Sequence, residues 1–309
     1  MKFVTFQTRP GPGGPRPTRF GILDGDTVRE VPGSLLGRLR EDDGLAQLRA
    51  LGPSGFSGEH RLGDVALRAP LPRPNSMRDF MLVEEHVKGS LGEVPAEWYR
   101  IPVYWKGNCD TVIGPEATVP WPYYTDKLDF ELELGAVIGR RAFRVDVGEA
   151  AECIAGFTVF NDWSARDIQM REMSVGLGVG LSKDFATSLG PCLVTPDEFD
   201  VTTARMRARV NGEVWSEGTL GGMRFSFPEV ISHLSQEQPL QPGDVLGSGT
   251  VARGCGLELD RWIRPGDTVE LEVDGIGVLR NVVGPKNPPP GPGAGIPSIL
   301  RPAAPANGA

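Results

Sequence analysis

The sequence predicts an α+β fold in which strands outnumber helices. Short segments of strand character, bounded by Gly, Pro, Asn and Asp, recur from the start of the chain to about residue 284, and they cluster instead of alternating with helices. Helical periodicity is limited to a few short stretches, of which residues 35–51 are the clearest near the N-terminus. With 309 residues, the chain can bury a substantial core in one large domain or in two.

Residues 1–70 are expected to form a small, β-rich N-terminal domain. KFVTF at the start has strand character, and FGILDGDTVREV reads as a hairpin that turns at Asp24-Gly25. The proline-rich stretch APLPRPNSMRD, residues 69–79, predicts the boundary with a main domain over residues 71–285.

In the main domain, MRARVNGEVWSEG predicts a tight hairpin across Asn211-Gly212. Ser226 and Glu229 have capping-box spacing at the start of a short amphipathic helix. Residues 286–309 are rich in Pro, Gly and Ala, so we expect a flexible tail there.

Composition excludes several classes of protein. The formal net charge of -8 disfavours nonspecific binding to nucleic acid or to an anionic membrane, and no apolar run approaches the 18 residues that a membrane span needs. The start of the chain lacks the apolar segment of a signal peptide, so we expect a cytoplasmic protein. The four cysteines form no CxxC pair, VGLGVGLSKD lacks the Gly-Lys-Ser/Thr of a phosphate loop, and no G-x-S-x-G motif occurs.

The segment KLDFELELGAVIG carries the strongest functional signal. In a strand, Asp129, Glu131 and Glu133 would share one face, with neighbouring positions roughly 6.6–7 Å apart. Taken alone, this pattern is more typical of an acidic strand face in water. The apolar GAVIG that follows favours an interior strand instead, where gathered carboxylates need a cation or protons.

A third acidic residue follows in AGFTVFNDWSARDIQMRE. Asp162 lies where a predicted strand ends and a helix begins, and Ser164 with Asp167 has the spacing of a helix cap. An all-oxygen set of ligands suits Mg²⁺, Mn²⁺ or Ca²⁺.

These segments resemble the fumarylacetoacetate hydrolase (FAH) family. LDFELELGAVIG is similar to the family's metal-binding strand, and FNDWSARDIQ to its most recognisable motif. LSKDFATSLGPCLVTPDE, VNGEVWSEGT, PGDVLGSGT and RPGDTVELEVDGIGVLRN follow in the family's order, so that the resemblance covers about residues 70–284. It implies a mixed β-sandwich roll that follows a small β-rich domain in the chain, and it implies a homodimer.

The resemblance also implies roles for individual residues. The metal ligands would be Glu131, Glu133, Asp162 and Asp79. His86 would be the general base, oriented by Glu258, and Lys183 would stabilise developing negative charge. Four further positions match groups that line the family's substrate pocket: Arg166, Gln169, Thr250 and Trp105. His60 and His233 are expected to have only structural roles.

The implied activity is divalent-metal-dependent hydrolysis of a C–C bond in a diketo acid or acylpyruvate, through a metal-bound enolate. The same site would also suit a dehydratase, decarboxylase or isomerase of a small 2-keto acid, and an inactive metal-binding module is a further alternative. Met81, Trp105 and Met173 stand where the family's namesake enzyme has tyrosines that contact its substrate, and Gly89 stands where smaller relatives pair a glutamate with the histidine. Fumarylacetoacetate itself is therefore not the expected substrate.

Overall fold

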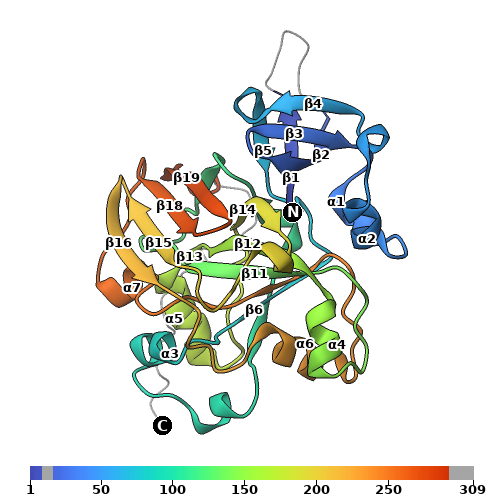
Figure 1. The fold of residues 1–309 in the computed structure, drawn as a ribbon. Helices are drawn as coiled ribbons and strands as arrows, with labels where there is room; N and C mark the ends of the chain where they lie inside the picture. The colour runs from blue at the N-terminus through green and yellow to red at the C-terminus, as the bar shows by residue number, and fades with distance from the viewer. Residues whose placement is uncertain (9–16, 292–309) are drawn as a thin grey trace, which may run out of the picture.

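The computed structural model describes residues 1–8 and 17–291, and its largest element is a mixed sheet (Figure 1). The twelve strands of this sheet are β1 (Lys2–Thr8), β2 (Arg19–Asp24), β3 (Thr27–Val31), β4 (Gly58–Arg61), β5 (Val65–Arg68), β6 (Ser76–Phe80), β7 (Tyr104–Gly107), β8 (Val112–Ile113), β11 (Leu132–Ile138), β12 (Ile154–Asp162), β14 (Thr187–Val194) and β17 (Asp244–Gly247). Their main order is β4-β3-β2-β1-β14-β12-β11-β17-β6-β7, with β5 on β1 and β8 on β14.

A second sheet packs against the middle of the first. Its strands, in order, are β16 (Glu213–Gly218), β15 (Met206–Val210), β18 (Thr268–Val273), β19 (Gly277–Lys286) and β9 (Thr118–Trp121). Contacts run from β15, β18 and β19 to β11, β12 and β14, and they bury side chains such as Phe157, Val159 and Leu271 in one core. β6–β17, β14–β8 and β19–β9 are parallel pairs and the rest are antiparallel, so the predicted mixed β-sandwich is confirmed.

Helices are short and lie around the sheets. The α-helices are α1 (Leu35–Leu39), α2 (Gly44–Arg49), α3 (Glu84–Leu91), α4 (Val147–Glu152), α5 (Arg166–Val175), α6 (Phe227–Ser235) and α7 (Gly256–Leu259). Single 3₁₀ turns are η1 (Pro53–Gly55), η2 (Leu62–Asp64), η3 (Ala96–Tyr99), η4 (Cys109–Thr111) and η5 (Pro196–Glu198), and a two-stranded ribbon pairs β10 (Leu128–Asp129) with β13 (Ser164–Ala165). None of the helices within the described residues is long and apolar enough to cross a membrane.

The N-terminal strands continue the main sheet. β1 pairs with β14 through Phe3 and Leu193, so the sheet runs unbroken from the predicted N-terminal domain into the main one, and the division at residue 70 stays a prediction. The β2–β3 hairpin is present, with its two-residue turn at Gly25-Asp26, one position later than predicted. Residues 35–51 form two helices instead of one, and Asp43 between them adopts a left-handed conformation.

Two local signals in the main domain are confirmed. Asn211 and Gly212 both have positive φ angles, the requirement of a tight hairpin between β15 and β16. Ser226 and Glu229 form the predicted capping box of α6. β19 extends to Lys286, and most of the predicted tail lies outside the described residues.

Candidate active site and metal centre

Neighbouring strands of the main sheet bring the acidic residues together. Asp79 lies in β6, Glu133 in β11 and Asp162 at the end of β12, while Glu131 forms an isolated bridge just before β11. All four are at most 4% exposed. The sequence around them is therefore an interior strand region and not an acidic face in water.

A glycine in the intervening strand makes this convergence possible. β17 separates β6 from β11 and carries Gly247 at the level of Asp79. A Cβ atom at Gly247 would lie 2.2 Å from Asp79 Oδ1 and 3.3 Å from Glu133 Oε2. The missing side chain thus leaves the space in which the two carboxylates meet across the strand.

Two buried cations face these carboxylates. Lys183 Nζ lies 2.7 Å from Glu131 Oε2 and 2.5 Å from Asp162 Oδ2. Arg166 Nη2 lies 2.8 Å from Glu131 Oε1. Its Nε donates to Asp129 Oδ2 at 2.8 Å. Glu131 therefore pairs with both cations, Arg166 through Oε1 and Lys183 through Oε2.

Asp129 has a role that the sequence did not reveal. The expected continuous strand is interrupted at Phe130, so Asp129 turns away from Glu131 and Glu133. Its carboxylate instead accepts from the backbone N–H groups of Gly256 and Leu257, at 2.8 and 3.0 Å, as well as from Arg166. Asp129 therefore fixes the position of Arg166.

The predicted helix cap at Ser164 and Asp167 is wrong. Ala165 occupies the N-cap of α5, and the Ser164 hydroxyl donates to the backbone carbonyl of Asp162. The Asp167 carboxylate accepts from the Thr125 hydroxyl and the Asp126 N–H. The carboxylate of Asp167 thus binds residues about 40 positions earlier in the chain, where the local pattern predicted a helix cap.

Electrostatics divides the four carboxylates into two kinds. Burial opposes the ionisation of Glu131, but Lys183 and Arg166 outweigh it and hold the pKa of this carboxyl below its ordinary value. Burial raises the pKa of Glu133 well above its ordinary value, and the charges of Asp79, Glu131 and Asp162 raise it further. Burial also raises the pKa values of Asp162 and Asp79. These groups need an additional positive charge, or protons, to stay buried.

The donor set fits a divalent cation. Asp79, Glu131 and Asp162 each offer an oxygen within 4.8 Å of the others. Glu133 Oε2 and Asp162 Oδ1 are buried with no hydrogen-bond partner among the described residues. Four carboxylates face two cationic side chains, which leaves at least two negative charges for an ion bound through oxygen.

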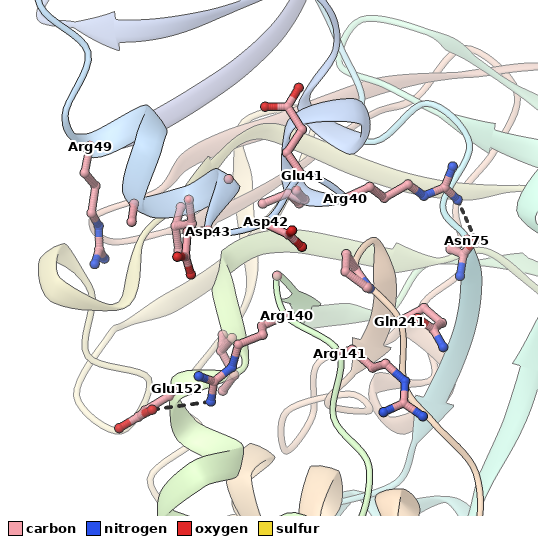
Figure 2. A pocket seen from close by; sticks show the side chains of 17 residues that line it. Arg40, Glu41, Asp42, Asp43, Arg49, Asn75, Arg140, Arg141, Glu152 and Gln241 are labelled. Carbon is pink, nitrogen blue, oxygen red and sulfur yellow. Dashed lines mark hydrogen bonds and ion pairs between the residues drawn. The ribbon is translucent and has the colours of Figure 1, made fainter.

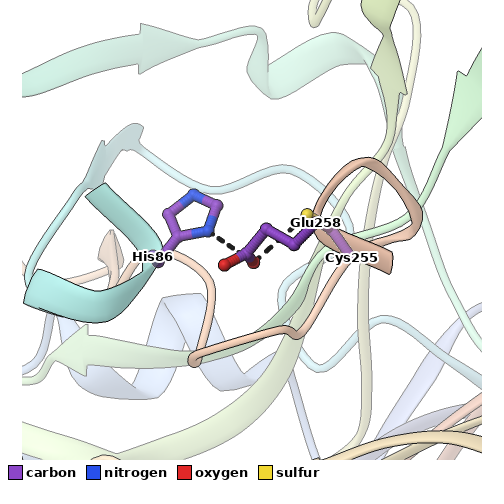
Figure 3. Close-up of side chains that lie close together, drawn as sticks. All are labelled: His86, Cys255 and Glu258. Carbon is purple, nitrogen blue, oxygen red and sulfur yellow. Dashed lines mark hydrogen bonds and ion pairs between the residues drawn. The ribbon is translucent and has the colours of Figure 1, made fainter. Parts of the chain in front are cut away.

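The other predicted dyad is formed between two short helices. His86 in α3 and Glu258 in α7 are joined by a 2.9 Å hydrogen bond from Nδ1 to Oε2 (Figure 3). The backbone N–H of Arg253 and the thiol of Cys255 also donate to Glu258. Because an ionised carboxylate only accepts, Nδ1 carries the proton in this pair and Nε2 is left as the basic atom.

Gly89 provides the space that Glu258 occupies. It lies one helical turn after His86 in α3, and a Cβ atom there would be 2.5 Å from Glu258 Oε1 and 3.2 Å from its Cδ. The glutamate absent from position 89 is thus replaced by Glu258, which reaches the imidazole from α7. No side chain larger than that of glycine fits at position 89 without moving this carboxylate.

Replacing Gly89 by alanine should lower kcat by about tenfold or more, because the base loses its orienting partner. The helix itself should not weaken, since alanine favours a helix interior by about 1 kcal/mol over glycine. In a Glu258→Asp background, whose carboxylate is one methylene shorter, the same change should cost little. Gly63→Ala, where the added Cβ meets nothing within 4 Å, is the control. An undiminished kcat in Gly89→Ala would contradict this arrangement.

The acidic cluster and His86 open into one cavity of about 260 Å³. Nine predicted site residues line it: Asp79, His86, Trp105, Glu131, Glu133, Arg166, Gln169, Lys183 and Thr250. Asp162 and Glu258 are not part of the lining, but Asp162 binds Lys183 and Glu258 binds His86.

Two predicted substrate contacts also hold the carboxylates. Trp105 Nε1 donates to Asp79 Oδ2 at 3.2 Å, and the Thr250 hydroxyl donates to Glu133 Oε1 at 3.2 Å. Gln169 Oε1 accepts from Arg166, which leaves its amide NH₂ as a donor toward the cavity. The individual roles of these residues stay predictions.

The other histidines lie elsewhere. His60 pairs with Glu30 at 2.8 Å and packs on Phe6 among the N-terminal strands, and His233 is exposed on α6. A second cavity of about 970 Å³ between α1–α2 and the end of β11 contains none of the predicted site residues (Figure 2). Its lining mixes exposed charges of both signs, such as Arg140 and Glu152, which lie 3.3 Å apart.

The sandwich thus carries a buried acidic cluster that could hold a divalent cation, next to a His–Glu pair. A sequence model of the fumarylacetoacetate (FAA) hydrolase C-terminal domain matches residues 77–284. The chain belongs to the FAH family.

Similar proteins catalyse different reactions. Oxaloacetate tautomerase YisK of Bacillus subtilis (strain 168) is 32% identical over 275 residues, which are 83% of this chain and 88% of that protein. The human mitochondrial oxaloacetate tautomerase FAHD2A is 34% identical over 224 residues, 71% of this chain and 70% of that protein. The crystal structure of 5-carboxymethyl-2-hydroxymuconate delta-isomerase from Mycobacterium smegmatis is 28% identical, with a TM-score of 0.71 and coverage of 92% and 99%.

Proposed function

We propose that the protein is a divalent-cation-dependent tautomerase that interconverts the keto and enol forms of a small 2-keto acid. The supporting observation is a single cavity in which a carboxylate-paired histidine, His86, adjoins the acidic cluster. The two curated relatives described above are oxaloacetate tautomerases, which supports this reaction over the hydrolysis that the sequence first suggests.

The cation would be held by Asp79, Glu131, Glu133 and Asp162. When bound, it would polarise the ketone of the substrate and neutralise negative charge on the ketone oxygen.

The His86–Glu258 pair would transfer the proton and stabilise the charge that this transfer leaves on the imidazole. His86 Nε2 takes a proton from the carbon next to the ketone, and the resulting imidazolium is stabilised by Glu258 at 2.9 Å. The electron pair of the broken C–H bond forms the carbon–carbon double bond as the ketone π electrons move to oxygen. Protonation of that oxygen, by the imidazolium or by water, gives the enol.

Lys183 and Arg166 would stabilise the charge that develops on oxygen. Burial would lower the pKa of Lys183, but the carboxylates of Asp162 and Glu131 raise it above its ordinary value. Lys183 therefore stays an ammonium group at the wall of the cavity, where it supplies a fixed positive charge.

Hydrolysis of a C–C bond is the second candidate. A histidine that is paired with a buried carboxylate and faces a cavity can equally deprotonate a water molecule. Attack of that water on a second carbonyl of a diketo acid would release a carboxylic acid and pyruvate or a related keto acid.

The experiment compares the two reactions on the whole chain. The protein, with Mg²⁺ or Mn²⁺ and again with EDTA, is mixed with 2-keto acids and with acylpyruvates. Loss of the enol absorbance and exchange of the C3 protons in D₂O, both abolished by EDTA, are expected for the tautomerase. Stoichiometric release of a carboxylic acid without faster C3 exchange would establish the hydrolase, and loss of water or CO₂ would contradict both.

A further inference from the structure

The more exposed part of the cavity lining has a different chemical character from the buried carboxylate site. Its side chains are aliphatic or thioether and come from the segment after β6, the end of α3, the segment before β7, and α5 with the loop that follows it. The residues are Met81, Leu91, Val103, Met170, Met173 and Val179. We call this set the apolar rim.

In the part of the chain that the structure describes, four side chains of the apolar rim are exposed. Met170 is 61% exposed, Leu91 and Val103 are each 43% exposed, and Met173 is 38% exposed. Exposed apolar side chains that gather at the mouth of a polar cavity are typical of a ligand-binding groove.

No free cation lies at the apolar rim among residues 1–8 and 17–291. Among the described side chains that line the cavity, the only arginine and lysine are Arg166 and Lys183. Both are buried against carboxylates: Arg166 against Asp129 and Glu131, and Lys183 against Glu131 and Asp162. They belong to the charged end, where the keto-acid head would lie.

A second carboxylate on the substrate would therefore lose water without gaining an ion pair. Burying an anion against Met, Leu and Val side chains is unfavourable when no donor replaces its hydration. An apolar substituent of the same size would instead cover these side chains and gain from the contact.

Resting on the proposed tautomerase function, we infer that the natural substrate is a 2-keto monocarboxylate whose remote end is apolar. The keto-acid head lies at the acidic cluster and His86, and the hydrocarbon substituent lies against the apolar rim. The dicarboxylate oxaloacetate, the substrate in the names of the two tautomerases described above, is then a poorer substrate for this chain.

Oxaloacetate and 4-methyl-2-oxopentanoate make a matched pair, because an isopropyl group replaces a carboxylate of nearly the same shape. C3 proton exchange in D₂O is followed by NMR for both, and each rate is divided by the rate without protein, which removes the different acidities of the two compounds. The quantity compared is kcat/KM for C3 exchange divided by the uncatalysed rate constant. We expect this ratio to be about tenfold or more higher for 4-methyl-2-oxopentanoate than for oxaloacetate.

Met173→Arg tests the apolar rim itself. An arginine there should shift the preference toward oxaloacetate by about tenfold, since it supplies the missing partner for a carboxylate. Met170→Arg, at a more exposed position of α5, is a second variant that the fold should tolerate. Val214→Arg, at a 47% exposed position of β16 outside the cavity, should leave the preference unchanged.

Failure of the tautomerase proposal and failure of the substrate inference give different results. If neither compound exchanges faster with protein, the tautomerase proposal fails. If exchange is fast but oxaloacetate is favoured and both arginine variants leave the preference unchanged, the inference about the substrate is overturned and the tautomerase stands. If both variants instead convert a dimer to a monomer in size-exclusion chromatography, a second copy covers the apolar rim and the inference is also overturned.

Discussion

Replacing Glu133 by glutamine should stabilise the metal-free protein and, at the same time, abolish its binding of divalent cations. Glu133 is fully buried, and its Oε2 has no hydrogen-bond partner among the described residues. Burial raises its pKa, and three neighbouring carboxylates raise it further. A neutral amide of the same shape removes this repulsion, whereas the cation loses a charged ligand. We expect the free energy of unfolding to rise near pH 8 by about 1–3 kcal/mol, the usual cost of one buried polar atom without a partner.

The sign of the pH dependence follows from the raised pKa. A carboxyl group with a raised pKa in the folded state binds its proton more tightly than in the unfolded chain, so stability is lost as pH rises from the unfolded toward the folded pKa. The gain in Glu133→Gln should therefore be small near pH 4 and grow toward pH 8. Thermal unfolding with EDTA measures it, and the exposed Glu93→Gln is the control.

Magnesium or manganese should raise the Tm of the wild-type protein but not that of Glu133→Gln. If the variant is instead less stable without metal and still binds the cation with unchanged affinity, Glu133 acts only as a hydrogen-bond acceptor for Thr250. That outcome would remove it from the set of metal ligands.

Replacing His86 by glutamine should lower kcat by about 10²- to 10⁴-fold and leave the fold and the cation affinity unchanged. The glutamine amide can still donate to Glu258, so the carboxylate is not left unpaired, but it cannot take a proton. The measurement is C3 exchange together with a cation titration. His233→Gln on the exposed side of α6 is the matched control and should retain full activity.

This variant also separates an enzyme from an inactive metal-binding module. If His86→Gln and the wild type exchange protons at the same rate, the imidazole is not the base. The histidine would then only link α3 to α7 through Glu258.

The sequence predicted the parts of the fold that local chemistry determines. Asn211-Gly212 specifies its turn because both residues tolerate positive φ, and Ser226 with Glu229 satisfies the first N–H groups of α6 within four residues. The apolar GAVIG that follows the acidic segment predicted an interior strand. The structure agrees, since every residue of β11 is buried.

Features that depend on contacts between distant segments could not be predicted. Gly247 and Gly89 are ordinary glycines in the sequence, but each leaves the space for a carboxylate from another element. Asp129 seemed equivalent to Glu131 and Glu133 until the interruption at Phe130 turned it toward Arg166. Asp167 fits a capping pattern, yet Thr125 and Asp126 bind its carboxylate.

The claim that the buried carboxylates hold a divalent cation is tested most directly by anomalous diffraction from crystals grown with Mn²⁺. We expect one anomalous peak per chain, within bonding distance of carboxylate oxygens of Glu131, Glu133 and Asp162, with Lys183 displaced from between Glu131 and Asp162. A peak only at other residues, or none in this cluster with Lys183 still bridging the two carboxylates, would contradict the account.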